Sequence, residues 1–198
     1  MGAFSVDLER MYYLKLGARR TSPAARTAFW LFNSELHCVA SYRLGRFAER
    51  LRARNRFLGE VALTAYRVLN RWVTHIDHAD ISRFADIGPG LLVMHRYGLV
   101  VGPASIGRNL VLHQNVTIGQ RSAGGDEGVP KIGDNVWIGP GAVLSGGITI
   151  GDGVTISAGT VLSKDVPAKC LVAGNPGRVI RQNYDNTAML DLPAAWDG

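Results

Sequence analysis

Between residues 81 and 162 an aliphatic side chain recurs every six residues, with two breaks of phase. The phase slips by one residue before Val100 and is interrupted for longer between Ile118 and Ile132. The positions expected to point inward are Ile81, Ile87, Val93, Val100, Ile106, Leu112, Ile118, Ile132, Ile138, Leu144, Ile150, Ile156 and Leu162. Alternation alone would suit an ordinary sheet, but ordinary strands do not keep a six-residue phase over so many units.

A six-residue unit is long enough for one short strand and one corner, so three units complete a triangular coil. Glycine often follows the aliphatic residue, and glycine and asparagine supply the corner backbone angles that bulky residues resist. Stacked coils bury a continuous aliphatic column, and their stability arises between neighbouring coils. The thirteen inward positions correspond to a little over four coils. We therefore predict a mainly β fold, a parallel β-helix of hexapeptide repeats, over residues 80–182.

Residues 1–79 lack this repeat and show helical spacing of apolar residues instead. Ser22-Pro23 predicts a helix start, because serine caps a helix and proline suits its first position. That helix is expected to run to Phe32, and two further helices are expected over residues 35–53 and 57–72. The last of them is expected to pack through Leu58, Val61, Ala65, Val68 and Leu69.

Glycine and charge divide at the same place. Residues 1–80 contain 4 of the 24 glycines and 13 Lys and Arg against 7 Asp and Glu, whereas residues 81–198 contain 9 of each charge. The whole surplus of the +6 net charge therefore lies in the first part. We expect an N-terminal helical domain over 1–79, the β-helix domain over 80–182 and a C-terminal tail over 183–198.

The overall composition excludes several classes of protein. A hydrophobic content of 46% excludes an intrinsically disordered chain, and no uncharged apolar run reaches the roughly 18 residues of a membrane-spanning helix. Asp7 and Glu9 precede any apolar stretch, which argues against a secretory signal. Cys38 and Cys170 make no disulfide framework, so we expect a cytoplasmic protein.

Six arginines cluster along the second helix and the turn after it: Arg43, Arg46, Arg50, Arg52, Arg54 and Arg56. One interpretation is attraction to anionic lipid or nucleic acid, and the other is a solvated helical face. Glu49 and Glu60 interrupt the charge and no nucleic-acid motif accompanies it, so the solvated face is favoured. We expect no nucleic-acid partner, and contact with a membrane surface stays the less favoured alternative.

Several stretches beyond the repeat carry a family resemblance. The helical stretch SPAARTAFWLFNSELHCVASYRLGRFAERL is followed by DISRFADIGPGLLVMHRYGLVVG, VTIGQ, PKIGDNVWIG, GAVLSGGITIGDGVTISAGTVLSKDVP and AGNPGRVI. Over residues 20–182 the chain resembles serine acetyltransferases and their relatives in exopolysaccharide biosynthesis. The repeat alone would also fit sugar-nucleotide acyltransferases or carbonic anhydrases. The resemblance implies that the β-helix is left-handed, an exception to the usual crossover rule.

The resemblance also implies the chemistry of an acyl transfer. A hydroxyl needs a base before it attacks a thioester well, and His95 matches the family's catalytic histidine. Asp80 matches the acidic partner that holds the imidazole tautomer and stabilises its charged form. The two residues lie fifteen positions apart, a little less than one coil of eighteen, so stacking brings them close.

Acetyl-CoA is the donor that the resemblance implies, with direct transfer in a ternary complex. The backbone N–H of Gly119 is the candidate donor for the oxyanion. The family's CoA lies in a cleft between neighbouring subunits, which implies a homotrimer or a dimer of trimers. The residues expected to line this cleft by position are Gly139, Ala142, Ala158, Gly159 and Arg178. Lys164 and Arg178 offer positive charge for the phosphates.

Three positions depart from the serine acetyltransferase pattern. The family has an acid before the helix that starts at Pro23, another before the catalytic histidine, and an Arg-His pair before the loop proline. This chain has Ser22, Met94 and Gly128-Val129 there. The groups that clamp an amino acid's ammonium and carboxylate are thus missing, and a buried charge without a partner is costly. We therefore expect a sugar or glycan hydroxyl as acceptor, with L-serine as the alternative.

The loop from Gly119 to Lys131 breaks the repeat, and such interruptions often form a binding face. Arg121 and Asp126 in the loop, together with Ser22, are the candidate acceptor-binding residues; a solvated loop is the competing interpretation.

The remaining candidate sites have less support. His75, Asp77, His78 and Asp80 match no closed zinc pattern, so no metal is expected. His113 is expected to be a satisfied corner residue, and neither cysteine has an evident base for an acyl-cysteine step. A non-catalytic scaffold remains the alternative of a different class, whereas a zinc carbonic anhydrase is disfavoured because three suitably spaced coil histidines are not evident.

Overall fold

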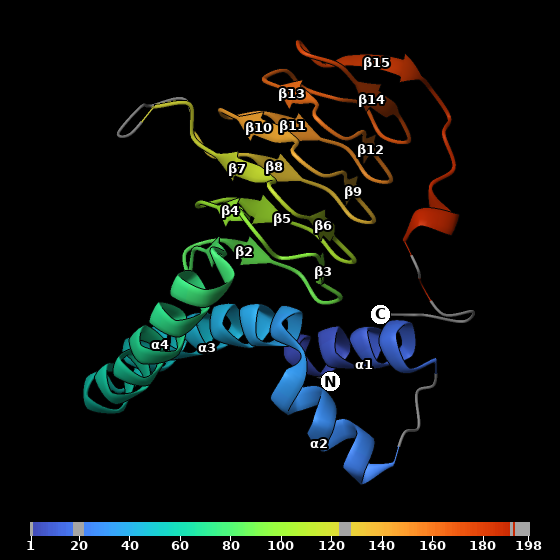
Figure 1. Cartoon of the computed structure of the whole chain (residues 1–198). Helices are drawn as coiled ribbons and strands as arrows, with labels where there is room; N and C mark the ends of the chain where they lie inside the picture. Colours follow the sequence, from blue (N-terminus) through green and yellow to red (C-terminus); the bar gives the residue numbers. More distant parts are fainter. Residues whose placement is uncertain (1, 18–21, 123–127, 191, 193–198) are drawn as a thin grey trace.

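The computed structural model describes residues 2–17, 22–122, 128–190 and 192, as a group of helices below a three-sided coil of short strands (Figure 1). The helices are α1 (Ala3–Leu16), α2 (Pro23–Phe32), α3 (Ser34–Arg54) and α4 (Arg56–Asp77), with a 3-10 turn η1 (Thr187–Met189) near the C-terminus. The strands are β1 (Asp80–Ile81), β2 (Asp86–Ile87), β3 (Leu92–Met94), β4 (Val100–Val101), β5 (Ser105–Ile106), β6 (Val111–His113), β7 (Thr117–Gly119), β8 (Lys131–Ile132), β9 (Trp137–Ile138), β10 (Val143–Ser145), β11 (Thr149–Ile150), β12 (Thr155–Ile156), β13 (Val161–Leu162), β14 (Leu171–Ala173) and β15 (Arg178–Arg181).

Side-chain caps define where three of the helices begin. The capping oxygen of Ser22, Asn33 or Asn55 accepts the N–H three residues later, at 3.2, 2.7 and 3.1 Å respectively. These bonds satisfy backbone donors that the first helical turn leaves unpaired. The three predicted helices are confirmed, although α4 extends to Asp77 and α1 was not predicted.

The strands form the three faces of a parallel β-helix. Face 1 contains β1, β4, β7, β10 and β13; face 2 contains β2, β5, β8 and β11; face 3 contains β3, β6, β9, β12 and β14, with β15 added antiparallel. Every other pairing is parallel, and each strand pairs with its counterparts in the coils before and after it. The predicted fold class, a β-helix of hexapeptide repeats preceded by helices, is therefore confirmed.

The aliphatic column lies inside the coil as the period predicts, with one exception. Twelve of the thirteen predicted inward residues are buried, but Val100 is 47% exposed. Its neighbour Val101 is buried at 1% exposure and pairs in register with Ile81 and Ile118. The prediction for Val100 was wrong because the turn before β4 adds two residues to the six-residue repeat. The sequence suggested that it adds only one.

The repeat also continues further than the period suggested. After Leu162 the inward positions are Val166 and Val172, which are buried and pair with Ile150 and Ile156. The step from Leu162 to Val166 is only four residues, so the six-residue phase is lost there although the coil is not. The molecule has about five coils, and not a little over four.

A buried ionic cluster fastens the helices to the first coil. The Asp7 carboxylate accepts the backbone N–H groups of Gly90 and Leu91 at 2.7 and 2.8 Å and pairs with Arg43 at 2.7 Å. Arg43 also donates to the carbonyl oxygens of Ile87 and Gly88 at 2.6 and 2.7 Å. Burial raises the pKa of Asp7, and the Arg43 guanidinium and the two N–H groups oppose that rise. Residues from α1 and α3 therefore seal the open lower end of the coil.

The segment after β15 returns along the outside of the coils toward α1 (Figure 1). Tyr184 donates its backbone N–H to the Lys169 carbonyl at 2.8 Å, and the Asn186 amide donates to the Asn135 carbonyl at 2.9 Å. At its lower end the Leu190 carbonyl accepts a hydrogen bond from the buried Arg10 of α1. We call residues 182–190 the strap, because they link the last coil to the first helix.

The packing of α4 differs from the prediction. Leu63, Tyr66 and Val73 face inward and are buried. Leu58, Val61, Ala65 and Val68, which were expected to form the packed side, are exposed, and Leu69 is only partly buried. The helix has apolar residues on two adjoining sides, so the period alone selected the wrong one. No helix in the described ranges is both long and apolar enough to cross a bilayer.

Candidate active site

His95 lies at the corner where face 3 turns back into face 1. It directly follows β3, is exposed, and has a φ of 55°, in the left-handed region that is uncommon for residues other than glycine. Gly98 in the same turn has a φ of 68°, so this turn contains two left-handed residues. The same corner of each of the next three coils contains one left-handed residue, namely Asn115, Gly141 and Gly159. The two extra residues before Val101 therefore belong to the turn that carries His95. We call this edge of the molecule the His95 corner.

Asp80 lies at the same corner. Its backbone N–H donates to the Leu99 carbonyl at 2.8 Å, and Leu99 is the last residue of the turn that His95 begins. Burial is the main cause that raises the pKa of Tyr66 in α4, and the nearby Asp80 charge adds to it while Arg83 opposes it. Asp80 is exposed, so its carboxylate lies at the surface where the helices meet the first coil.

His113 is one coil above this turn and is held by its neighbours. It pairs in register with Met94, its Nδ1 lies 2.9 Å from the Ile138 carbonyl oxygen, and its ring lies 4.6 Å from that of Trp137 between centroids. A carbonyl oxygen can only accept, so Nδ1 carries the proton. The expectation of a satisfied corner histidine agrees with this geometry.

Gln114 follows His113 and was not selected from the sequence. By register it lies over His95, and its backbone carbonyl accepts the Gly141 N–H at 3.0 Å. Its side-chain Oε1 is buried and has no hydrogen-bond partner among the described residues. A buried amide oxygen without a protein partner is unusual, and its position one coil above an exposed histidine makes Gln114 a further candidate site residue. Nothing in one sequence separates this glutamine from the other polar corner residues.

The residues expected to line the CoA cleft divide into two groups. One group follows the His95 corner upward through the coils and consists of Gly139, Ala158 and Gly159. The Gly139 N–H donates to the Ile156 carbonyl and the Gly159 N–H donates to the Pro140 carbonyl, both at 2.8 Å. A Cβ on Gly139 would meet the backbone N of Ala158 at 2.7 Å, so glycine is needed there for stacking. Ala142 is fully buried inside the coil and offers no surface to a cleft.

Lys164 and Arg178 lie together at the far end of the coil. They line one shallow pocket over the inward residues Leu162 and Val172, with Gly177 between β14 and β15. Both side chains are exposed. Asp165 also lines the pocket, and its carboxylate accepts the Thr149 N–H at 2.7 Å. The two cations outnumber this one acid, which suits a phosphate or another anion.

Gly119 and the loop after it lie at the other end of face 1. Gly119 ends β7, opposite Ser145 of β10, and a Cβ there would meet nothing within 4 Å. The yellow chain after β7 leaves the coil at this point in Figure 1, carrying the exposed Arg121. Asp126 lies outside the described residues. The structure therefore does not bring Gly119 and Arg121 to the His95 corner of the same chain.

Ser22 has a local role in the structure. Its hydroxyl oxygen accepts the Ala25 N–H at 3.2 Å and caps α2. This is the contact that the Ser-Pro helix start predicts.

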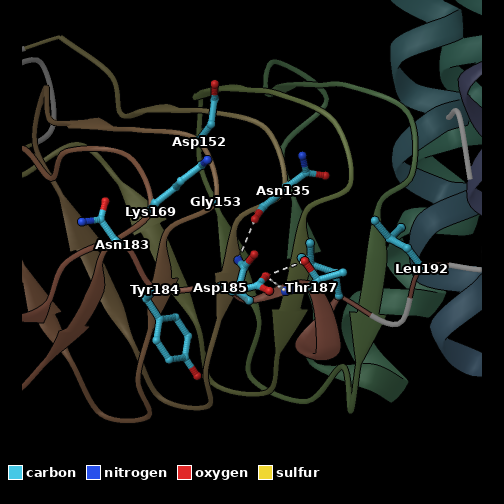
Figure 2. Close-up of a pocket in the computed structure, with 11 residues that line it drawn as sticks. Asn135, Asp152, Gly153, Lys169, Asn183, Tyr184, Asp185, Thr187 and Leu192 are labelled. Carbon is cyan, nitrogen blue, oxygen red and sulfur yellow. Dashed lines mark hydrogen bonds between the residues drawn. The ribbon is translucent and has the colours of Figure 1, made fainter.

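A polar pocket lies beneath the strap, at the corner between faces 2 and 3 (Figure 2). Lys169, Asp152 and Asn135 line it from the coils, and Tyr184 and Asp185 line it from the strap. Two hydrogen bonds from Thr187 lower the pKa of Asp185. The whole width of face 3 separates this pocket from the His95 corner, so the pocket is not part of the same site.

The metal and thiol candidates add nothing to the His95 corner. Among the described residues no group of three or more His, Cys, Asp and Glu is arranged to hold a metal ion. His78 caps α4 with a φ of 48°. Cys38 and Cys170 are buried and are not joined in a disulfide.

Comparison with known sequences places the repeat in a known class. Residues 130–164 match the family model described as bacterial transferase hexapeptide (six repeats). The chain is 34% identical over 164 residues to a serine acetyltransferase of Staphylococcus aureus, covering 81% of this chain and 73% of the relative. It is 40% identical over 154 residues to the chloroplastic serine acetyltransferase 1 of Arabidopsis thaliana, covering 74% of this chain but 47% of the relative. The chain thus spans about half the length of the plant relatives that it matches.

Solved structures give the same result. A serine acetyltransferase from Brucella abortus in complex with coenzyme A superposes with a TM-score of 0.73 at 29% identity, covering 91% of this chain and 67% of that one. A Neisseria gonorrhoeae serine acetyltransferase in complex with serine superposes with a TM-score of 0.71 at 28% identity, covering 90% and 68%.

Proposed function

Because the chain belongs to the serine acetyltransferase family, we propose that it is an acetyl-CoA-dependent O-acetyltransferase with its site at the His95 corner. The observation that carries the proposal is the placement of Asp80 and His95 at one corner, joined through the backbone bond from Asp80 to Leu99. The extended length of that turn and the left-handed backbone of His95 are the kind of local irregularity that functional sites retain.

In this proposal His95 is the general base. Its unprotonated ring nitrogen removes the proton from the acceptor hydroxyl while the hydroxyl oxygen attacks the thioester carbonyl carbon of acetyl-CoA. The tetrahedral intermediate collapses with cleavage of the carbon–sulfur bond, and the CoA sulfur takes the proton back from the imidazolium. Asp80 stabilises the imidazolium between the two steps. The products are the acetyl ester and free CoA, so no other reactant is needed.

For the donor, we propose that CoA extends along the corner from His95 past Gly139, Ala158 and Gly159. Strands stack about 4.8 Å apart, so the four steps from the first to the fifth coil span about 19 Å. Lys164 and Arg178 at that end offer charge to the phosphates. This assignment is supported by the coenzyme A complex of the Brucella relative.

We also propose a homotrimer. A single chain supplies one wall along the His95 corner, while Gly119 and the loop with Arg121 lie at the other end of face 1. A neighbouring copy that presents its loop to this corner would complete the site. The cytoplasm remains the proposed compartment, although two of the plant relatives are a chloroplastic and a mitochondrial protein.

L-serine is the acceptor that the comparisons favour. The matched relatives are serine acetyltransferases, and one related structure contains serine, so the sugar acceptor expected from the sequence lacks support from them. A sugar hydroxyl stays as a second candidate on one observation. Met94, beside His95, packs partly against the apolar core where the family has an acid, so it offers no charge to an ammonium group.

The test is a panel of acceptors with the purified full chain and acetyl-CoA, following the release of free thiol. L-serine should give turnover, with homoserine and D-serine as matched controls for chain length and configuration. Turnover of sugars with none of serine would overturn the choice of acceptor but keep the enzyme. The absence of both turnover and CoA binding would overturn the enzyme and favour a scaffold.

A further inference from the structure

The exposed side of α4 has no partner within the described chain. Six apolar side chains on it are 49–77% exposed: Phe57, Leu58, Val61, Val68, Trp72 and Ile76. Val61, Ala65, Val68 and Trp72 follow the three- and four-residue spacing of one helix face. Because Leu63, Tyr66 and Val73 already fill the contact with the rest of the protein, this row is additional to the core. We call the row the outer face of α4.

Basic residues are frequent in the segment that contains the hairpin turn. Residues 50–71 contain six arginines and one acid, Glu60. Glu60 pairs with Arg52 at 2.9 Å and with Arg67 at 3.9 Å. Arg50, Arg54, Arg56 and Arg71 form no ion pair with any residue in the described ranges. The segment therefore combines an apolar row with a net charge of +5.

The position of this segment leaves it accessible. α3 and α4 form a hairpin whose turn, at Asn55, points away from the coils in Figure 1. Phe57 at 77% exposure lies next to that turn, between Arg56 and Leu58. The buried ionic cluster of Asp7 and Arg43 holds the opposite end of the hairpin against the first coil. The turn of the hairpin is therefore exposed, while its other end is held against the first coil.

We propose that the hairpin tip and the outer face of α4 dock on an anionic lipid bilayer. A helix with an apolar row beside several arginines matches the pattern of helices that lie in the membrane interface. The guanidinium groups meet the phosphates and the apolar side chains enter the headgroup boundary.

Charge argues against the two other occupants. A second copy docked through the same hairpin tip would bring two copies of residues 50–71 together, each of net charge +5, which like-charge repulsion opposes. A nucleic acid would satisfy the arginines but leave Leu58, Val61 and Val68 in water. A bilayer accounts for both the charge and the apolar row.

Docking would also fix the distance of the His95 corner from the lipid. α4 has 22 residues and leads directly to Asp80. At a rise of 1.5 Å per residue the helix is about 33 Å long, which sets the scale of that distance. This docking does not depend on the proposed acetyl transfer.

The experiment is co-sedimentation of the purified full chain with vesicles. Vesicles of phosphatidylcholine and phosphatidylglycerol at 7:3 should bind it at least about tenfold better than phosphatidylcholine alone, and 0.5 M NaCl should weaken the binding. Arg54→Ser/Arg56→Ser should lower the affinity roughly tenfold or more. Val68→Ser/Trp72→Ser should also lower it, because both side chains are exposed in the free protein and would insert in the bound one.

Matched control variants remove basic and exposed apolar side chains from the β-helix instead of from the hairpin. Lys131→Ser/Arg181→Ser removes two charges, and Ile180→Ser removes an exposed apolar side chain. Both should bind vesicles like the wild type, and thermal unfolding should show that all variants are folded.

Three results would overturn the proposal. One is the absence of binding to the anionic vesicles. Another is a change of oligomeric mass in Val68→Ser/Trp72→Ser without any vesicle binding, which would assign the face to a second copy. The third is salt-sensitive binding to duplex DNA or RNA that exceeds vesicle binding and is unaffected by the same variant.

Discussion

At the scale of single residues, the His95 corner is defined by backbone conformation as much as by chemistry. Seven described residues other than glycine have a positive φ, and four of them are asparagines at coil corners or in the strap. Asparagine tolerates this conformation because its short side chain bonds locally, whereas most residues with a Cβ pay roughly 1–2 kcal/mol for it. His95 is thus held in a conformation that the surrounding turn imposes.

This conformation provides a sharp test of the proposed base. His95→Asn should preserve the left-handed turn while removing the proton acceptor, so kcat should fall about 10²- to 10⁴-fold with little change in thermal stability or CoA affinity. Steady-state kinetics, calorimetric CoA titration and thermal unfolding measure the three quantities. His75→Ala, which removes an exposed histidine from α4, serves as the control and should retain activity within about twofold. Full activity in His95→Asn would show that another group is the base.

At the scale of elements, the register of each strand follows from the aliphatic column except where a corner changes length. Val100 and Val101 are adjacent and chemically identical, and only their neighbours decide which one is inside. Val101 lies between Ile81 and Ile118 in face 1, because the turn with His95 and Gly98 adds two residues to the hexapeptide. The irregular corner therefore shifts every residue of β4 to the opposite side.

The two valines make a matched pair for testing that register. Val101→Ala removes two buried carbons and leaves a cavity, so the free energy of unfolding should fall by about 2 kcal/mol. Val100→Ala should change it by less than about 0.5 kcal/mol, because about half of Val100 is exposed and the residue lies outside the coil. Denaturant titration of both variants gives the comparison. Equal losses, or a larger loss for Val100→Ala, would contradict the assigned register.

At the scale of the whole molecule, contacts between distant parts of the sequence hold the helices to the coil. Asp7 and Arg43 join two helices to residues 87–91, and the strap joins the fifth coil to Arg10. Arg10 donates to the carbonyl oxygens of both Gly90 and Leu190, so one buried guanidinium contacts the first coil and the strap. Residues in α1 and at the lower end of the strap are thereby fixed to the same end of the β-helix.

The strap should therefore stabilise more than its own residues. Asn186→Ala removes the hydrogen bond to the Asn135 carbonyl and leaves that acceptor without its partner, at a cost of about 1–3 kcal/mol. Faster hydrogen exchange is expected in residues 184–190 and in α1, since Leu190 also accepts from Arg10. Gln182→Ala, at an exposed position of the same segment, should leave both rates unchanged. If α1 exchanged at the wild-type rate in Asn186→Ala, the strap and the helix would be uncoupled.

The sequence by itself determined the parts of this protein that depend on local pattern. The six-residue period predicted the coil and twelve of its inward residues, because a repeat that buries one residue per strand must show that residue at a fixed interval. The Ser-Pro pair and the apolar spacing predicted the start of α2 and the presence of α3 and α4. The candidate base and its acidic partner came from family motifs, and the coil geometry brings these two residues to one corner.

Only the tertiary structure decided the features that depend on distant contacts. The period could not choose between the two apolar sides of α4, because that choice depends on where α3 and the first coil lie. It could not place Val101 inside, extend the coil to Val172, or select Gln114, because corner lengths and buried polar atoms are properties of stacked neighbours. The repeat in the sequence shows which residues are apolar. The packing of one coil or helix against another decides which of those apolar residues become buried.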